Sequence, residues 1–480
     1  MRTVALVIGS ERVDGDAPTV EVRSPATGEI IAQVEQGNRE DVGRAVAAAW
    51  QAQVQLAQLD PFTRASMCHR VAELLEQRKE EIARDLSLEQ GKPYRLEALP
   101  EVETAAEMFR DAAEGIKRLE TAVIPSSDPA KRVITIRQPR GVYGILTPWN
   151  FPVAIPSEYL SGGLAAGNAM VWKPSEWTPV SAQHLAQCFL DADVPNGTLN
   201  LILGDPSEVG DELAGHPGIV AIGLTGSSRT GQAVARRAAG KAMLLELGGN
   251  GPTIIFDDAD IDRAVAQTAF GCFANAGQIC DSTERILVHE SVHDRVIDGL
   301  VARASEVRVG LPFDEQTTMG PIANEPTASK VDRHLADATS RGARVVHGGG
   351  RADGFPTRLY YQPTVLDGVI PSMLIQSEET FGPVAPVMAF ADEGEALRFA
   401  NESPLGLVGS VFTRDVARAM RVAEALQCGV VNINETSAYW QPHTPFGGFS
   451  GKQSGLGRIG GVYTLMEMTQ LKTITLDVTG

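Results

Sequence analysis

Cys280 is the residue of this 480-residue sequence whose setting best suits covalent chemistry. It ends the segment Asn275-Ala-Gly-Gln-Ile-Cys280, a glycine-containing turn that we expect between a helix ending near Phe273 and a strand beginning at Arg285. A thiolate is a strong nucleophile, and a turn beside a helix can both expose the sulfur and lower its pKa through backbone N–H groups. The other cysteines are expected to be small buried side chains: Cys68, Cys188, Cys272 and Cys428.

Glu246 and Asn150 have settings that suit a general base and a hydrogen-bond donor. Glu246 lies in Leu245-Glu-Leu-Gly-Gly-Asn, after an apolar strand, so burial among leucines is expected to raise its pKa into the range of a general base. Asn150 lies in Thr147-Pro-Trp-Asn-Phe-Pro, where prolines and aromatic rings fix the turn and hold the amide ready for a developing oxyanion. Each pattern alone also fits an ordinary strand-end Glu or a turn Asn.

Two further segments have features that suit a dinucleotide. Lys173-Pro-Ser-Glu176 follows an apolar strand, and its ammonium and carboxylate suit the two hydroxyls of a ribose. Glu176 would repel a 2′-phosphate, which favours NAD over NADP, although NADP stays an alternative. Thr225-Gly-Ser-Ser-Arg-Thr-Gly231 is a glycine-rich turn before a helix, whose free N–H groups can meet a pyrophosphate, but it is not the G-x-G-x-x-G fingerprint.

The elements that must position these residues alternate along most of the chain. Residues 39–117 show helical spacing of Ala, Leu, Glu and Arg, with a helix stop at Gly91-Lys-Pro93. From Gly141 to Glu246, apolar runs alternate with helical stretches, which predicts βαβ units and a parallel, doubly wound sheet. A second α/β pattern begins at Gly248. Residues 132–139 alternate like a strand that lacks an obvious partner nearby, and residues 473–478 alternate again.

Composition and charge exclude several classes of partner. The chain is 43% hydrophobic and 21% charged, as in ordinary globular proteins. Its net charge of −18 argues against a nucleic acid or an anionic membrane, so a small molecule is the expected partner. The apolar N-terminal run is too short for a signal peptide, no stretch resembles a membrane span, and five scattered cysteines form no disulfide framework, so we expect a cytoplasmic protein. The eight histidines lack metal-ligand spacing, so no metal is predicted.

Taken together, these motifs resemble those of the aldehyde dehydrogenase superfamily over nearly the whole chain. The motifs that agree in order and spacing are residues 147–152, 173–176, 225–231, 246–249, 278–280, 378–383 and 445–448. The resemblance implies an α/β aldehyde dehydrogenase-like fold in three parts. These are an NAD-binding domain with a five-stranded variant Rossmann sheet (1–120 and 139–247), an α/β catalytic domain (248–455) and a small β oligomerisation extension (121–138 and 456–480). The extension would complete a neighbour's sheet, which implies self-association to a dimer or tetramer.

The resemblance also implies NAD-dependent oxidation of an aldehyde to its carboxylic acid. Cys280 would attack the aldehyde, while the Asn150 amide and the Cys280 backbone N–H hold the oxyanion. Loss of hydride would leave a thioester, which Glu246 would hydrolyse by activating water; this glutamate favours hydrolysis over acyl transfer to CoA. The implied cofactor contacts are Trp149, Lys173, Ser175, Glu176, Gly226, Ser227, Gly231, Leu247, Glu379 and Phe381.

The substrate pocket is where this sequence departs from the family's pattern. Many hydrolytic relatives carry Lys at the position of Tyr159, and relatives that oxidise succinic semialdehyde tend to carry Arg at the positions of Glu158 and Ala274. A substrate carboxylate would lose both partners here, so we rank dicarboxylic semialdehydes low. The expected pocket residues mix acidic and aromatic character: Glu158, Tyr159, Asp281, Glu435, Tyr439, Trp440, His443 and Phe446.

This mixture predicts a neutral aromatic or aliphatic aldehyde, with a cationic aminoaldehyde second because aromatic faces and carboxylates both attract cations. The alternatives are an aminoaldehyde or semialdehyde dehydrogenase, and a catalytically silent structural relative. A thiol esterase or amidase would need a histidine beside the nucleophile, and none lies in the matched segments.

Overall fold

Five parallel strands form the centre of the first sheet in the computed structural model, which describes residues 2–15 and 17–479. The strands are β8 (Val142–Leu146), β9 (Ala169–Lys173), β10 (Leu199–Leu201), β11 (Ala221–Thr225) and β12 (Ala242–Glu246). They stand in the order β12-β11-β8-β9-β10, and every neighbouring pair is parallel. The predicted βαβ units and parallel sheet are therefore confirmed.

Short antiparallel strands extend both edges of this sheet. β2 (Leu6–Ile8) and β3 (Glu11–Val13) lie beyond β10, and β20 (Gly455–Leu456) pairs with β12 at Leu245 and Glu246. The carboxyl end of the Glu246 strand therefore contacts a segment far along the chain. β1 (Arg2–Val4), β5 (Ile30–Gln36) and β4 (Ala17–Arg23) form a separate sheet, in which β4 and β5 pair antiparallel across the predicted turn at residues 25–28.

Helices precede and accompany the first sheet. They are α1 (Arg39–Leu56), α2 (Pro61–Gln77), α3 (Lys79–Gln90), α4 (Leu99–Ile116), α5 (Ala154–Ala166), α6 (Pro179–Leu190), α7 (Asp211–Gly215) and α8 (Ser228–Arg237). Asn38 forms a capping box at the start of α1, and Asp60 accepts backbone N–H groups at the start of α2. α3 ends at Gly91, whose φ of 97° is a left-handed conformation that glycine adopts without strain, so the predicted helix stop is confirmed.

Helix α5 carries two glycines in its interior, Gly162 and Gly163. A Cβ at Gly162 would lie 2.5 Å from the side chain of Thr464, and one at Gly163 would lie 2.3 Å from the sulfur of Met170. The two glycines therefore let α5 pack closely against its neighbours. Within residues 2–15 and 17–479, no helix is both long and apolar enough to cross a bilayer.

The second half of the chain forms a seven-stranded sheet with its own buried core. Its order is β15-β16-β17-β14-β13-β18-β19. The strands are β13 (Gly251–Ile255), β14 (Thr283–His289), β15 (Arg344–His347), β16 (Thr364–Asp367), β17 (Val384–Phe390), β18 (Val408–Phe412) and β19 (Val430–Ile433). The helices are α9 (Ile261–Phe273), α10 (His293–Glu306), α11 (Glu325–Ser340), α12 (Leu374–Ser377), α13 (Glu393–Glu402) and α14 (Val416–Ala425). β13 begins with Gly251 and Pro252, and β18 carries Gly409 in its interior, so both are short runs with weak strand signals.

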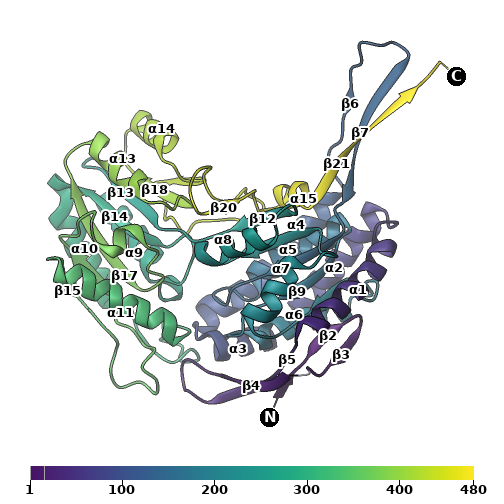
Figure 1. The fold of residues 1–480 in the computed structure, drawn as a ribbon. Helices are drawn as coiled ribbons and strands as arrows, with labels where there is room; N and C mark the ends of the chain where they lie inside the picture. The colour runs from purple at the N-terminus through teal and green to yellow at the C-terminus, as the bar shows by residue number, and fades with distance from the viewer. Residues whose placement is uncertain (1, 16, 480) are drawn as a thin grey trace.

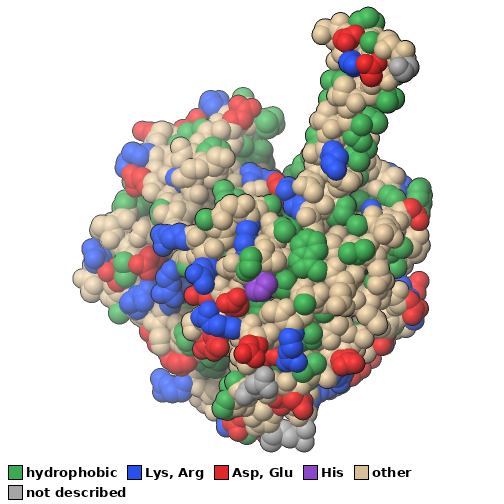
Figure 2. All heavy atoms as spheres, turned by 45° about the vertical axis from the view of Figure 1, so that its right-hand side comes forward, with side chains coloured by type: hydrophobic (Ala, Val, Ile, Leu, Met, Phe, Trp, Pro, Cys, Tyr) green, Lys and Arg blue, Asp and Glu red, His purple; other side chains and the backbone are tan. Residues whose placement is uncertain are grey.

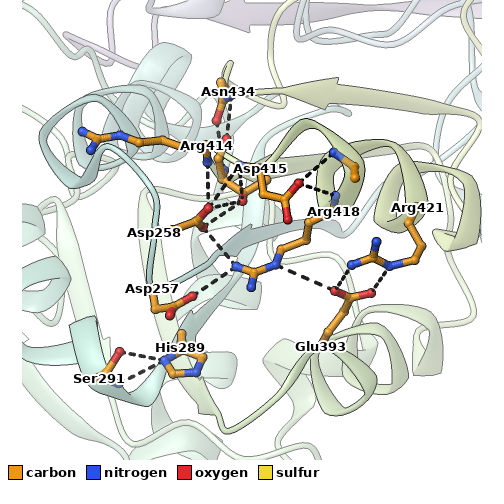
Figure 3. Close-up of polar contacts among 12 residues, drawn as sticks. Asp257, Asp258, His289, Ser291, Glu393, Arg414, Asp415, Arg418, Arg421 and Asn434 are labelled. Atoms are coloured by element: carbon orange, nitrogen blue, oxygen red, sulfur yellow. Dashed lines mark hydrogen bonds and ion pairs between the residues drawn. The ribbon is translucent and has the colours of Figure 1, made fainter.

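Asp258 ties together the carboxyl ends of β13 and β18, which are parallel neighbours (Figure 3). Its carboxylate accepts hydrogen bonds from the Thr413 hydroxyl at 2.8 and 2.9 Å and from the backbone N–H groups of Arg414 and Asp415 at 3.1 Å. Arg418 of α14 pairs with the same carboxylate at 3.0 Å. These contacts fix the turn that begins α14 and leave Asp258 with partners on several sides, which is typical of a structural site.

A three-stranded antiparallel sheet projects from the body as an arm (Figure 1). It consists of β6 (Val123–Ile124), β7 (Lys131–Pro139) and β21 (Thr469–Asp477), with Ile134 opposite Ile474. The two alternating segments therefore pair with each other within one chain. The extended strand begins later than residue 456, where the predicted extension starts, because α15 (Val462–Glu467) packs against α4 and α5 instead. The proposed domain boundaries stay a prediction.

Candidate active site

The backbone before Cys280 is held in an unusual conformation. Asn275, Ala276 and Gly277, in the short helical turn Ala274–Gly277, all have positive φ, at 48°, 54° and 72°. Such values cost about 1–3 kcal/mol for each non-glycine residue and persist only where neighbours fix them. A Cβ at Gly277 would lie 2.2 Å from the carbonyl oxygen of Gly382, and one at Gly249 would lie 2.0 Å from the carbonyl oxygen of Cys280. The nucleophile loop is therefore packed between two other backbone segments, with glycine making both contacts possible.

Gln278 and Asn275 hold this loop from inside. The Gln278 amide donates to the carbonyl oxygen of Asn275 at 2.8 Å, and its oxygen accepts from the backbone N–H of Ala323 at 2.9 Å. Asn275 receives a hydrogen bond on its side-chain oxygen from Gln90 at 3.0 Å, and its backbone N–H donates to Glu97 at 2.7 Å. These residues belong to α3, the following turn and the nucleophile loop, so the first part of the chain sets the position of Cys280.

Glu246 lies at the end of β12, is 3% exposed, and has the side chains of Cys280 and Thr225 beside it. Burial raises the pKa of its carboxyl to about 8, and the nearby charges of Asp281 and Glu379 act in the same direction. The oxygen Oε1 has no hydrogen-bond partner among the described residues. A buried carboxylate of this kind, beside the cysteine, is suited to take a proton from the thiol or from a water molecule.

The expected lowering of the Cys280 pKa is wrong for this structure. Burial raises the pKa of the thiol well above its ordinary value, and the carboxylates of Glu246 and Asp281 add to this because they disfavour a second negative charge. The sulfur therefore carries its proton until a base removes it. Cys280 keeps partial exposure, whereas the other four cysteines are buried, so the predicted contrast between Cys280 and the rest is confirmed.

Asn150 follows β8 and is 2% exposed. Its side-chain N–H donates to the carbonyl oxygen of Gln278 at 3.0 Å, two residues before the nucleophile. Its own backbone carbonyl accepts from Lys92 at 2.7 Å and from the Asn275 amide at 3.2 Å. Of the two N–H bonds of the Asn150 amide, one is engaged by Gln278 and the other is left to donate elsewhere. The structure thus brings Asn150 and the Cys280 loop together, as the sequence predicts.

A cavity of about 500 Å³ opens beside Cys280 and Glu246. Its other polar and aromatic lining includes Glu97, Glu107, Phe151, Glu158, Asp281, Trp440, His443 and Phe446. No Lys or Arg occurs among the described residues that line it. Asp281 and Glu158 are buried, and burial raises the pKa of each carboxyl to about 7. The cavity is therefore apolar with a surplus of acidic groups.

The described wall of this cavity does not include Tyr159, Tyr439 or Glu435. Tyr159 is fully buried behind it, and its hydroxyl lies 2.9 Å from that of Thr225, which also contacts Glu246. Tyr439 is 49% exposed, and Glu435 pairs with Arg263 at 3.2 Å. Tyr159 therefore stands behind the base, and the other two lie outside the substrate space.

Residues suggested for the pyrophosphate and the nicotinamide gather around the end of β12. Ser227 caps the N-terminus of α8, where its side chain accepts the N–H of Thr230. A Cβ at Gly231 would lie 2.3 Å from the side chain of Leu247, and Gly226 donates its N–H to the carbonyl oxygen of Glu246 at 3.1 Å. A helix start beside close-packed glycines suits a phosphate group.

The loop that carries Glu379 and Phe381 faces the same region. Glu379 accepts the N–H of Gly249 at 3.0 Å, and the Phe381 ring lies edge-on to Trp149 with centroids 5.6 Å apart. Glu284 accepts the N–H of Phe381 at 2.6 Å, which fixes the positive φ of 57° at that residue. Glu284 is absent from the sequence-based set because a Glu inside a strand carries no local signal of this role.

The Lys173 motif lies at the carboxyl end of β9. Lys173 is buried and donates to the carbonyl oxygen of Pro174 at 3.0 Å, while Ser175 lies next to an exposed Glu176. The ammonium and carboxylate therefore stand at the edge where ligands bind parallel sheets. Among residues 2–15 and 17–479, no group of three or more His, Cys, Asp or Glu side chains is arranged to hold a metal ion.

The first sheet is doubly wound, has a helix start suited to phosphate and carries a buried carboxylate at the end of β12, while the second half of the chain presents a thiol beside that carboxylate. This combination defines a nucleotide-dependent dehydrogenase that works through cysteine. The chain belongs to the aldehyde dehydrogenase family, whose model matches residues 13–474. The resemblance found in the sequence motifs is thus confirmed, and the enzyme is an NAD(P)-dependent aldehyde dehydrogenase.

Three relatives illustrate the range of this similarity. A mitochondrial succinate-semialdehyde dehydrogenase of Arabidopsis thaliana is 39% identical over 99% of this chain and 89% of its own. The succinate-semialdehyde dehydrogenase GabD of Escherichia coli, whose name specifies NADP(+), is 37% identical over 99% of this chain and 98% of its own. A structure of betaine aldehyde dehydrogenase from Staphylococcus aureus in complex with NAD+ matches with a TM-score of 0.96 and 34% identity, covering 99% of this chain and 95% of that chain.

Proposed function

We propose that this enzyme oxidises an aldehyde to its carboxylic acid through a thioester on Cys280, with hydrolysis by water. The observation that carries the proposal is that Cys280 and Glu246 line one cavity, while the Asn150 amide is hydrogen-bonded to the loop that carries Cys280. Glu246 accepts the thiol proton as the sulfur bonds to the aldehyde carbon, and the free N–H of Asn150 donates to the resulting oxyanion. Oxidised nicotinamide, when bound, supplies the acceptor for the hydride that leaves this carbon.

Glu246 then serves a second time in the hydrolysis step. After releasing its first proton to solvent, the carboxylate accepts a proton from a water molecule as that oxygen attacks the thioester carbon. The carbon–sulfur bond breaks, the acid leaves and the Cys280 thiol is restored. Replacing Cys280 by Ser should abolish NADH formation with any aldehyde. A flat NADH trace for the native enzyme across an aldehyde panel would instead support the catalytically silent alternative.

We propose NAD as the preferred cofactor. The exposed carboxylate of Glu176, one residue from Ser175 and in electrostatic contact with Lys173, would repel a 2′-phosphate at the adenine ribose. The names of the relatives include both NADP(+) and NAD+, so they leave the choice between the two open. The ratio of kcat/KM for NAD to that for NADP measures this preference directly.

Two substrate classes have support, each from a different observation. The relatives' names agree better with the semialdehyde alternative than with the neutral aldehyde ranked first from the sequence. The cavity, however, offers no Lys or Arg among its described lining to pair with a substrate carboxylate, while Glu158 and Asp281 would repel one. We propose from the geometry that the far end of the aldehyde is uncharged or cationic, and we keep a dicarboxylic semialdehyde as the second candidate.

A three-substrate comparison separates these classes. The values of kcat/KM for benzaldehyde, an aminoaldehyde and succinic semialdehyde are measured with NAD at fixed pH. A preference for benzaldehyde or the aminoaldehyde supports the geometric proposal. A preference for succinic semialdehyde supports the class named in the relatives and would show that a cation is supplied to the cavity in some other way.

We also propose that the arm mediates self-association. Apolar side chains are visible along the surface of the arm in Figure 2. The exposed large apolar residues of its strands include Val123 at 76%, Leu471 at 58% and Leu476 at 58%. Exposed apolar strands with free edges are surfaces that a second copy can cover. The choice between dimer and tetramer, and the cytoplasmic location expected from the sequence, stay predictions.

A further inference from the structure

We propose that Lys92 is a positioning residue that holds the Asn150 amide in register with the sulfur of Cys280. The inference rests on the proposed role of Asn150 as the oxyanion donor. Lys92 lies between the end of α3 and the turn Tyr94–Ala98, in the segment that the sequence identifies only as a helix stop. It is 1% exposed, which is exceptional for a lysine.

Three groups contact the Lys92 ammonium. The nitrogen Nζ lies 2.6 Å from Oε2 of Glu101 and 2.7 Å from the backbone carbonyl oxygen of Asn150. It also lies 3.9 Å from the centre of the Phe151 ring, a favourable cation–π contact. Two of these three partners are consecutive residues of the turn that presents the oxyanion donor. The ammonium is therefore fixed against that turn by three contacts.

Glu101, the ion-pair partner of Lys92, also contacts the other side of the same turn. Its second oxygen, Oε1, accepts the backbone N–H groups of Val153 at 2.8 Å and Ala154 at 3.2 Å. Val153 is the N-cap residue of α5 and Ala154 is the first residue of the helix, and the apolar Val153 side chain offers no capping hydrogen bond of its own. Lys92 and Glu101 together thus hold the chain on both sides of Phe151, and the turn between β8 and α5 has little freedom to shift.

A second route connects Lys92 to the nucleophile loop. The Lys92 backbone N–H donates to the side-chain oxygen of Gln90 at 2.8 Å, and the Gln90 amide donates to Asn275 at 3.0 Å. The Asn275 amide in turn donates to the Asn150 carbonyl at 3.2 Å, the same oxygen that Lys92 contacts. Lys92 therefore joins the two halves of the reacting arrangement, the oxyanion donor and the loop of the sulfur.

Stability alone is a poor reason for this arrangement. Removing two charges from water is costly, and buried ion pairs are frequently no more stabilising than apolar residues of similar volume. The alternative explanation, a purely structural ion pair, predicts that any neutral replacement of both charges restores function. The positioning role predicts that it does not, because the hydrogen bond to the Asn150 carbonyl would still be missing.

The test compares Lys92→Met, Lys92→Arg and the charge-neutral double variant Lys92→Met/Glu101→Gln with the native enzyme. The rate of the NADH burst reports acylation, the thermal midpoint reports stability, and KM for aldehyde and for NAD reports binding. We expect Lys92→Met to slow the burst by about 10- to 100-fold with KM changed by less than about threefold, since a misplacement near 1 Å costs rate rather than affinity. The double variant should regain thermal stability without regaining burst rate, and Lys92→Arg should retain more of the rate than Lys92→Met.

A double-mutant cycle with Asn150→Ala makes the inference decisive. If Lys92 acts through Asn150, Lys92→Met changes the burst by less than about threefold when Asn150 is already Ala. The matched control is Lys79→Met, which removes a lysine that pairs with Glu103 at 2.7 Å on the surface, and its burst rate should equal that of the native enzyme.

Recovery of both stability and burst rate in the charge-neutral double variant would overturn the positioning role, as would full additivity in the cycle. Failure of the native enzyme to form NADH would instead contradict the proposed function. If Lys92→Met does not fold, the double variant and Lys92→Arg still decide the question, because each keeps the local charge balanced.

Discussion

Replacing Glu246 with Gln should slow both halves of the reaction, because the same carboxylate is proposed to take a proton from the thiol and later from water. The carboxyl is 3% exposed, and burial raises its pKa to about 8, so it can gain and lose a proton near neutral pH while lying beside Cys280. The amide of Gln cannot accept the proton of an attacking water. We expect kcat to fall by about 100- to 10,000-fold, the usual range for removing a general base.

The pH dependence of the native enzyme follows from the same group. Because the pKa is raised, the base form is scarce below pH 8 and predominates above it. The ionised fraction rises from about one tenth at pH 7 to about nine tenths at pH 9, so kcat should rise about tenfold over that interval. Stopped-flow and steady-state measurements of NADH absorbance between pH 6 and 10 provide the check.

Glu89 supplies a matched control for this experiment. Burial raises the pKa of its carboxyl to about 8 as well, but it holds the start of α6 through the N–H groups of Val180 at 2.9 Å and Ser181 at 2.6 Å, away from the described wall of the cavity. Glu89→Gln should change thermal stability and leave the pH dependence of kcat as in the native enzyme. A flat native profile between pH 7 and 9, or native turnover by Glu246→Gln, would refute the assignment of Glu246 as the base.

Three further outcomes are expected. The free energy of unfolding should fall as pH rises from 5 to 8. Several buried carboxyls have a folded-state pKa near 7 to 8, so in this range they hold protons that the unfolded chain, titrating near 4, has lost. Thermal midpoints measured across that range provide the check, and a rising midpoint would contradict the prediction. Glu176→Gln should raise kcat/KM with NADP by about tenfold while changing that with NAD little, and an unchanged ratio would remove Glu176 from cofactor choice. Leu471→Asp with Leu476→Asp should shift the assembly toward the 51.2 kDa monomer in light scattering, whereas an unchanged mass would place the contact surface elsewhere.

Much of the architecture could be predicted from local pattern. The strands that end at Leu146, Lys173, Thr225 and Glu246 are apolar runs between helical stretches, and the structure places them in one parallel sheet. The purpose of the two glycines in helix α5 could not be predicted in the same way, because they allow close packing against the side chains of Met170 and Thr464. Thr464 lies far along the chain from Gly162, so no local pattern reveals that contact.

Some features of the candidate site could likewise be predicted from the sequence, and others could not. Cys280, Glu246 and Asn150 could be chosen from their immediate neighbours, and the structure brings them together. The direction in which the Cys280 pKa shifts could not be predicted from the sequence, because it depends on burial and on the carboxylates of Glu246 and Asp281 in the folded cavity. The role of Lys92 also has no signal in the sequence, because its partners Glu101 and Asn150 meet it only when α3, α4 and the turn after β8 pack together.

The two glycine contacts of the nucleophile loop have a consequence for how such an enzyme can diverge. Gly249 and Gly277 let main chain touch main chain at the carbonyls of Cys280 and Gly382, so peptide groups rather than side chains set the location of the sulfur. Substitutions in the wall of the cavity can then change which aldehyde fits without moving the reacting atom. Backbone contacts therefore fix the position of the reacting sulfur, while side chains of the cavity wall such as Glu158 and Trp440 can change which aldehyde is accepted.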